Sequence, residues 1–161
     1  MLATGSLVVP QAWIDYNGHM MDAYYYVAFT EATEAFLDHV GLGATYRAET
    51  GCGIYTVESH VCFGKSVRAG ATLEYHSQLL ACDDKRLHLF HQMTESGNRE
   101  QVATNELMFL HVDLTAEQVK PMPPASSRAI RLLAAAHASL PAPPNAGRRI
   151  RMPTADPERS G

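Results

Sequence analysis

A carboxylate, an amide and an imidazole, those of Asp15, Asn17 and His19, lie within five positions of one another. Acyl transfer needs a base or nucleophile, together with donors aimed at the oxyanion that develops. We predict that Asp15 attacks a carbonyl or activates a water that does, while Asn17 and His19 orient the reacting groups. The alternative is a polar turn that caps a helix, because Asp and Asn are favoured in turns and caps. For His19 the sequence favours neither role over the other.

The segment that follows has the apolar spacing of a helix with one buried face, and we predict a helix over residues 23–40. Its predicted buried stripe is Tyr26, Phe29, Thr33, Phe36, Leu37 and Val40. Asp22 is the predicted N-cap, and Gly41 is the predicted residue just past the C-terminus. A helix N-terminus carries unpaired N–H groups and partial positive charge. The backbone N–H groups near Asp22 and Ala23 are therefore the predicted oxyanion donors.

The remaining sequence predicts strands separated by short polar turns. The predicted strands are 7–10, 54–63, 72–80, 86–93 and 102–112, and a shorter helix is predicted over 126–140. In the 54–63 strand, Tyr55, Val57, Val61 and Phe63 should share the apolar face. The last four strands should form an antiparallel meander that curves around the long helix, an α+β arrangement. We expect one domain over residues 1–140 and a poorly ordered, locally basic tail over 141–161.

Composition excludes several broad classes of protein. The 161 residues carry a formal net charge of −4, with 46% hydrophobic and 19% charged residues, which is typical of one globular domain and not of a nucleic-acid-binding protein. The sequence shows no long apolar run and no secretory leader, so we expect a cytoplasmic protein. The three cysteines lack a paired spacing, and we expect free thiols. We expect no metal and no cofactor; a metal site at Asp15, His19, Asp22 and His60 is the minor alternative.

The motif and the order of elements together resemble a known family. Asp15-Tyr16-Asn17-Gly18-His19, followed by Tyr25 in the first helical turn, resembles the hotdog-fold acyl-CoA thioesterases of the 4-hydroxybenzoyl-CoA thioesterase type. The resemblance implies a hotdog fold, a catalytic carboxylate at Asp15, a CoA thioester substrate, and a site between the subunits of a homodimer or a dimer of dimers. The Asp-x-Asn-x-His spacing also resembles plant acyl-ACP thioesterases. Many relatives have two asparagines where this chain has Met21 and Asp22, which changes the local hydrogen bonding.

A narrower resemblance is to the thioesterases that accompany L-carnitine dehydrogenase, and it rests on residues 13–20, 55–60, 84–91 and 110–113. It implies hydrolysis of betainyl-CoA to glycine betaine and CoA in carnitine degradation, with carnitine dehydrogenase as a possible functional partner. Two alternatives stay open: a general short-chain or aromatic acyl-CoA thioesterase, and a module that binds acyl-CoA without turnover. The intact Asp-x-Asn-x-His motif argues against the second. A hotdog dehydratase is a weaker alternative, because its helix-borne histidine pattern is not evident.

A betainyl group carries a permanent trimethylammonium charge, and aromatic faces hold such cations. Trp13 and Tyr16 are the predicted cage residues, because they lie outside the helix, and Tyr25 is a further substrate-binding candidate. Asp22 or Glu58 would add attraction to the cation. Glu58 and His60 could also complete the site across a dimer, or could be interface residues without chemistry. For the phosphates of CoA the candidates are Lys65, Arg68 and Arg86, each of which could equally be a solvated surface charge.

Overall fold

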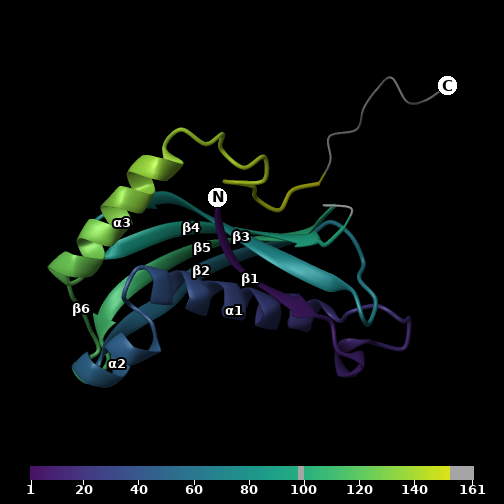
Figure 1. Ribbon diagram of the computed structural model, residues 1–161, viewed down its shortest axis with the longest axis horizontal. Coiled ribbons are helices and arrows are strands. Elements are labelled where there is room, and N and C mark those ends of the chain that lie inside the picture. The colour runs from purple at the N-terminus through teal and green to yellow at the C-terminus, as the bar shows by residue number, and fades with distance from the viewer. Residues whose placement is uncertain (98–99, 153–161) are drawn as a thin grey trace.

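An antiparallel sheet curls around one long helix, and a second helix lies on the outer face of the sheet (Figure 1). The computed structural model describes residues 1–97 and 100–152. Its strands are β1 (Leu2–Val8), β2 (Cys52–Phe63), β3 (Thr72–Cys82), β4 (Arg86–Glu95), β5 (Gln101–Asp113) and β6 (Gln118–Val119). Its helices are α1 (Asp22–His39), α2 (Ala44–Thr50) and α3 (Pro124–His137), and a short 3-10 turn spans Gln11–Trp13. This architecture confirms the predicted α+β class.

The order of strands in the sheet differs from the predicted meander. The order is β1-β3-β4-β5-β2, with β6 added to the end of β5, and all pairs are antiparallel. Strands β3, β4 and β5 form the meander, but β2 pairs with β5 and not with β3. The segment between β2 and β3 crosses the end of the sheet, where Gly64 N donates to Val102 O and Val9 N donates to Ala71 O, both at 2.9 Å. Among the described residues, β2 is therefore an edge strand over its whole length.

Helix α1 fills the concave face of the sheet. Its buried residues are Tyr25, Ala28, Phe29, Ala32, Phe36 and Leu37. The prediction that Tyr26 is buried was wrong, since Tyr26 is 42% exposed, and its neighbour Tyr25 takes the core position at 4%. Small alanines on the buried face let the helix approach the sheet closely. Because of this rotation of the helix, Tyr26 lies next to the uncovered part of the concave face.

The ends of α1 partly follow the sequence signals. Gly41 lies just past the helix with φ +73°, the left-handed conformation that glycine adopts at low cost, as predicted. The predicted N-cap was wrong: Met21 holds that position without a side-chain hydrogen bond, and Asp22 is the first helical residue. The short helix α2 and the strand β6 were not predicted. Both are seven residues or shorter and have little apolar periodicity to mark them.

A β-bulge interrupts β2. The register of β2 against β5 shifts between Thr56 and Glu58, so that Val57 is an extra residue in the strand. Ahead of the bulge Ile54 and Thr56 face α1; beyond it the residues facing α1 are Ser59, Val61 and Phe63, while His60 and Cys62 face outward. The prediction of one apolar face through Tyr55, Val57, Val61 and Phe63 was therefore wrong, because simple alternation does not continue through a bulge.

A chain of buried polar side chains connects β1, β3, β4 and α1. Thr4 Oγ1 lies 2.8 Å from Ser77 Oγ, and Ser77 Oγ lies 2.7 Å from His91 Nδ1. The other ring nitrogen of His91, Nε2, lies 3.0 Å from Thr33 Oγ1 on α1. Complete burial lowers the pKa of His91 to about 3, because the charged imidazolium would lose its hydration. His91 is therefore neutral at physiological pH, and its two nitrogens connect the sheet to the helix.

The outer face of the sheet is covered by α3 and by the segment that follows it. Ser126 Oγ donates to Gly41 O at 3.0 Å, and Leu79 N donates to His137 Nδ1 at 3.0 Å, which attaches α3 to the end of α1 and to β3. Residues 141–152 continue over the same face, while residues 153–161 of the predicted tail lie outside the described residues. Within the described part of the chain, no helix is long and apolar enough to cross a membrane.

Candidate active site

The motif loop, residues 14–21, is closed on itself by the backbone. Ile14 and Met20 form an isolated antiparallel bridge, Asp15 N donates to His19 O at 2.9 Å, and Gly18 N donates to Asp15 O at 3.0 Å. Gly18 has φ +77°, so this tight turn needs a residue that tolerates the left-handed region. The loop is attached to the sheet connection by Met20 N, which donates to Val67 O at 2.8 Å. The backbone thus fixes the positions of the three motif residues.

The carboxylate of Asp15 accepts hydrogen bonds from the loop that carries it. Oδ1 accepts the Asn17 N–H at 2.8 Å and the His19 N–H at 3.2 Å, and Oδ2 accepts the Asn17 side-chain amide at 3.3 Å. These bonds, first of all the one from the His19 N–H, hold the pKa of Asp15 below its usual value. Asp15 is therefore ionised at neutral pH, as both a nucleophile and a general base require. Asn17 and His19 orient this carboxylate through backbone N–H groups as well as through a side chain.

The N-terminus of α1 supplies the predicted donors only in part. The Ala23 N–H donates to the Asp22 carboxylate at 2.8 Å, so that carboxylate already occupies one of the two predicted oxyanion donors. The Asp22 N–H has no acceptor among residues 1–97 and 100–152. It belongs to the first turn of an 18-residue helix, where the partial positive charge is concentrated. Of the predicted donors, the Asp22 N–H is the one available to a carbonyl oxygen.

The aromatic candidates lie in three different environments. Trp13 stacks on Tyr24, with ring centroids 4.9 Å apart and planes 9° from parallel, so these two rings cover one face of each other. Tyr16 is 97% exposed at the tip of the loop. Tyr25 is buried, its hydroxyl donates to Lys65 O at 3.1 Å, its ring meets Phe63 edge-on, and burial raises its pKa. Within one chain the structure does not bring Trp13, Tyr16 and Tyr25 together around a common space.

The structure keeps Glu58 and His60 away from the motif loop of their own chain. Glu58 is exposed on the edge strand β2, and His60 lines a cavity on the outer face of the sheet. A second, smaller groove of about 260 Å³ lies on the concave side between α1 and the β5–β2 half of the sheet, and Tyr26, Glu34 and Asn105 contribute to its lining. No three His, Cys, Asp or Glu side chains of the described residues come together in a geometry that could hold a metal ion.

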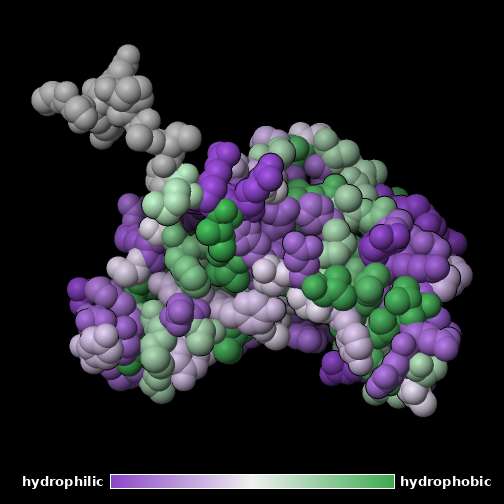
Figure 2. All heavy atoms as spheres, turned by 180° about the vertical axis from the view of Figure 1, so that it is seen from behind, coloured by the Kyte–Doolittle hydropathy of each residue, from purple (hydrophilic) through white to green (hydrophobic). Residues whose placement is uncertain are grey.

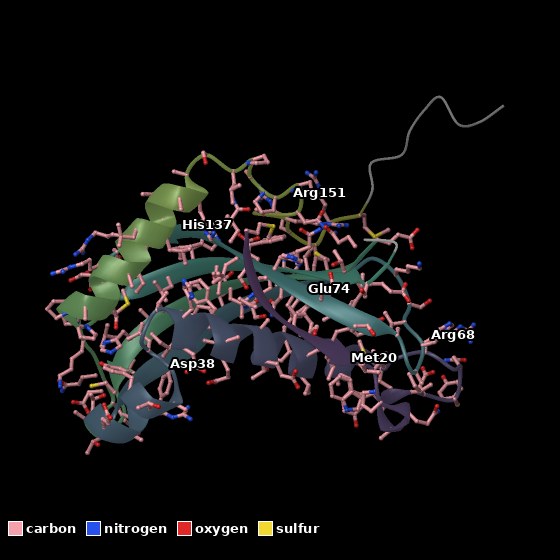
Figure 3. The ribbon with its side chains drawn as sticks, in the orientation of Figure 1. Met20, Asp38, Arg68, Glu74, His137 and Arg151 are labelled. Atoms are coloured by element: carbon pink, nitrogen blue, oxygen red, sulfur yellow. The ribbon has the colours of Figure 1, made fainter. Side chains whose placement is uncertain are left out.

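The three predicted phosphate-binding residues lie apart. Arg68 lies beside the motif loop, where its Nη1 is 3.7 Å from the position of a Cβ on Gly18, and Figure 3 shows Arg68 and Met20 at the same end of the molecule. Lys65 forms ion pairs with Glu95, at 3.5 Å, and with Glu100. Arg86 pairs with Asp83 at 2.9 Å in the β3–β4 turn, at the opposite end of β3 from the motif loop. Of the three, only Arg68 is near the loop and lacks an ion pair among the described residues.

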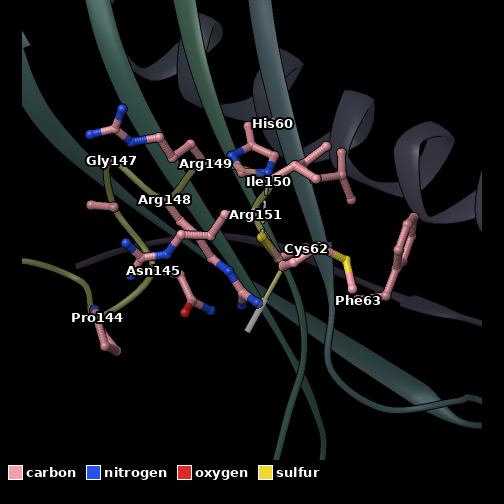
Figure 4. Close-up of a pocket in the computed structure, with 13 residues that line it drawn as sticks. His60, Cys62, Phe63, Pro144, Asn145, Gly147, Arg148, Arg149, Ile150 and Arg151 are labelled. Atoms are coloured by element: carbon pink, nitrogen blue, oxygen red, sulfur yellow. Dashed lines mark hydrogen bonds between the residues drawn. The ribbon is translucent and has the colours of Figure 1, made fainter. Parts of the chain in front are cut away.

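Sequence reasoning missed a cluster of cationic residues near His60. Arg148, Arg149 and Arg151 line the outer-face cavity, whose volume is about 990 Å³, together with His60 and Cys62 of β2 (Figure 4). The sequence marked this segment only as a locally basic part of a tail. The basic run was visible in the sequence, but its position over β2 depends on contacts that are distant in sequence.

The comparisons with known proteins agree with this geometry. Residues 9–130 match the thioesterase-like superfamily. The chain is 38% identical over 153 residues to the betainyl-CoA thioesterase of Pseudomonas aeruginosa, covering 95% of this chain and 96% of that one. It is 47% identical over 140 residues to an L-carnitine dehydrogenase/betainyl-CoA thioesterase of Agrobacterium fabrum, covering 86% of this chain but 28% of that longer protein.

A solved structure extends the agreement to three dimensions. A Staphylococcus aureus protein in complex with CoA superposes with a TM-score of 0.87 at 25% identity, covering 94% of this chain and 96% of that chain. The family match spans most of the chain, and the sheet wrapped around α1 is the hotdog arrangement that the motif predicted. The chain belongs to the thioesterase-like superfamily and is a thioester hydrolase with a hotdog fold.

Proposed function

We propose that the protein hydrolyses betainyl-CoA to glycine betaine and CoA, with Asp15 as the catalytic carboxylate. Two observations carry the proposal: backbone N–H groups fix Asp15 as an ionised carboxylate, and the Asp22 N–H at the start of α1 has no acceptor among the described residues. The choice of acyl group is supported by the relatives, two of which are named for betainyl-CoA thioester hydrolysis. By the same similarity we propose a role in carnitine degradation, with carnitine dehydrogenase as functional partner.

The chemistry follows from the nature of the two groups, a carboxylate and a hydrogen-bond donor. The Asp22 N–H donates to the thioester oxygen and stabilises the negative charge that develops there. Asp15 either attacks the carbonyl carbon itself, forming an anhydride that water then opens, or takes a proton from a water that attacks. In both routes the carbon–sulfur bond breaks, the CoA thiolate leaves and takes up a proton, and a carboxylate is the other product. Asn17 and His19 hold Asp15 in position throughout, and the His19 ring, which has no hydrogen bond among the described residues, can bind water or substrate.

We propose that the active protein is a homodimer, or a dimer of dimers, joined along β2. The edge strand offers unpaired backbone groups, and its outward apolar residues Tyr55 and Val57 are 49% and 52% exposed. Apolar side chains also reach the surface on the side of the molecule seen in Figure 2. Free apolar edges lead to aggregation unless they are covered, and an antiparallel copy of β2 would cover this one. The dimer would place Glu58 of one subunit near the site of the other.

The cytoplasm is the proposed location. Cys52, Cys62 and Cys82 are all free thiols, and thiols persist in a reducing compartment.

The test is free-thiol release from betainyl-CoA, measured beside acetyl-, butyryl-, benzoyl- and palmitoyl-CoA. We expect the highest kcat/KM for betainyl-CoA. A uniform rate over the neutral acyl groups would replace betainyl-CoA with a general acyl-CoA substrate while retaining Asp15 chemistry. No release from any substrate would indicate a module that binds acyl-CoA without turnover. Butyryl-CoA is the matched neutral control, because its acyl chain is of similar length.

A further inference from the structure

The segment after α3 places three arginines on the outer face of the sheet, next to β2. Arg148, Arg149 and Arg151 line one cavity with His60 and Cys62, which face outward beyond the β2 bulge. In Figure 4 the segment lies across from these β2 side chains, and Figure 3 shows Arg151 on the face of the sheet away from Met20 and the motif loop. The chain has 13 Lys and Arg residues against 17 Asp and Glu, so three cations within four positions stand out.

The sheet holds this segment in place at two points. The Gly147 N–H donates to Glu106 Oε2 at 2.7 Å, and the Gln78 side-chain amide donates to Pro141 O at 3.3 Å. Glu106 is itself fixed, because its other oxygen lies 2.7 Å from His88 Nε2. Gly147 has φ +71°, so the chain turns sharply at the anchor before the arginines. The position of the arginines is therefore determined by strands β3, β4 and β5.

The three guanidinium groups have no acidic partner among the described residues. The described ion pairs of the chain join Lys65, Arg86, His88 and Lys120 to carboxylates, and none involves Arg148, Arg149 or Arg151. The carboxylate that anchors this segment, Glu106, is already engaged by His88 and by the Gly147 N–H. Three cations without a carboxylate partner on one cavity attract an anion.

We propose that Arg148, Arg149 and Arg151 form the site for the phosphate groups of the nucleotide part of CoA. The inference rests on the proposed function, which makes a CoA thioester the substrate. The planar guanidinium group binds phosphate oxygens with two parallel hydrogen bonds. Three guanidinium groups match the three phosphate groups of CoA, which are the 3′-phosphate and the 5′-diphosphate of its adenosine. A cavity of about 990 Å³ is large enough for a nucleotide. His60, on the wall of the same cavity, lies on the edge strand along which the proposed dimer places the active site.

The proposal changes the assignment of the cationic residues. Lys65 and Arg86 already pair with carboxylates, so a phosphate would have to displace those partners before it could bind them. The tail arginines and Arg68 have no such competitor among residues 1–97 and 100–152. Arg68 is a single cation beside the motif loop, whereas the tail places three cations around one cavity. The energy of the phosphate contacts would be the same in the ground state and in the transition state, because the phosphates are far from the reacting carbon. Loss of the site should therefore raise KM and leave kcat unchanged.

The experiment compares the full-length wild type with the triple variant Arg148→Gln/Arg149→Gln/Arg151→Gln. Each is assayed with a thioester of CoA and with the same thioester of pantetheine, which lacks the nucleotide and its phosphates. We expect the variant to raise KM for the CoA thioester by about 10- to 100-fold with an unchanged kcat, and to leave KM for the pantetheine thioester unchanged. The matched control is Arg128→Gln/Arg131→Gln, which removes charge from exposed positions on α3 and should change neither value.

Binding of adenosine 3′,5′-bisphosphate, measured by calorimetry, makes the test independent of turnover. Wild type should bind it, and the triple variant should lose that binding while the α3 control retains it. An unchanged KM with unchanged binding would overturn the proposal. An equal rise of KM for the CoA and pantetheine thioesters would also overturn it, because that result indicates general damage to the site. If wild type hydrolyses neither thioester, the proposed function fails, and the calorimetric comparison still decides whether the arginines bind the bisphosphate.

Discussion

The two halves of the sheet differ in how completely one chain covers them. In the β1–β3–β4 half, α1 packs against the concave face, and even the polar side chains are joined in the continuous chain from Thr4 to Thr33 through His91. In the β5–β2 half, a groove separates the sheet from α1, and the edge strand exposes Tyr55 and Val57. We call the first half the complete side, because its polar and apolar side chains are packed within the monomer, and the second half the open side, because it leaves a groove and apolar side chains exposed. In the dimer that we propose, the Asp15 carboxylate lies on the complete side and the contact between subunits lies on the open side.

The largest expected effect comes from breaking the chemistry on the complete side. Asp15→Asn keeps an oxygen that can accept the Asn17 and His19 N–H groups, so the loop should keep its shape. It loses the negative charge, and kcat should fall by about 10³-fold. Thiol release under single-turnover conditions measures the loss, and circular dichroism checks the fold. A variant with near-normal kcat would remove Asp15 from the catalytic role.

The next effect tests whether the open side is an assembly surface. Tyr55→Asp/Val57→Asp places two charges on the exposed edge of β2, where a second copy would have to desolvate them. We expect the molar mass measured by light scattering to halve, and kcat/KM to fall about 10²-fold because the site loses its second subunit. The control is Leu132→Asp, which charges an apolar residue on α3 that is even more exposed, at 68%. A wild type that is already monomeric at assay concentration would contradict the dimer.

A smaller effect should appear in the stability of the complete side. His91 has a pKa of about 3 when folded and an ordinary value near 6.5 when unfolded, so the unfolded chain binds the extra proton between these values. Stability therefore falls as pH drops through that window, by about 2 kcal/mol between pH 7.5 and pH 5 for this group alone. His91→Phe should remove that part of the pH dependence while costing about 1–3 kcal/mol at pH 7.5, because Ser77 and Thr33 lose a partner. Urea unfolding at the two pH values measures both quantities, and an unchanged pH dependence in the variant would refute the assignment.

The smallest effect is expected on the open side. Ser59 Oγ donates to Asn105 Oδ1 at 2.8 Å, and this bond joins the edge strand to its neighbour. Ser59→Ala should lower the free energy of unfolding by about 0.5–1.5 kcal/mol, less than the loss of His91 on the other half. Urea unfolding of the two variants under the same conditions gives the comparison directly. A larger loss from Ser59→Ala than from His91→Phe would reverse the proposed difference between the halves.

The sequence predicted those elements whose pattern is local. The long strands and both long helices were found within a few residues of their bounds, because alternation and three-and-four spacing persist over many positions. The motif loop was also predicted, since Asp, Asn and Gly carry turn signals of their own. Which of Tyr24, Tyr25 and Tyr26 is buried was not predictable, because three adjacent tyrosines leave the rotation of α1 undetermined until the sheet packs against it.

Features that depend on distant contacts were missed. The pairing of β2 with β5 depends on a connection that crosses the end of the sheet, and the short turn signals favoured pairing with β3 instead. The tail arginines reach β2 because Glu106 and Gln78 hold the backbone that leads to them. Glu106 lies more than 40 positions before the residue it holds, and Gln78 lies more than 60 positions before. The roles assigned to Asp15, Asn17 and His19 stay predictions, to be decided by the variants described above.

The bulge at Val57 means that chain length, as well as residue identity, determines which side chains of β2 reach each face of the sheet. Deleting Val57 alone would restore strict alternation and leave the residues beyond it on their present faces. If the bulge were instead flattened with Val57 kept in the ladder, everything beyond it would rotate by half a turn. Phe63 would then leave its place against Tyr25, and His60 would turn from the arginine-lined cavity toward the helix. Evolution can therefore replace residues of this strand one at a time, but an insertion or deletion in the regular part of the strand would exchange the inner and outer surfaces beyond it in one step.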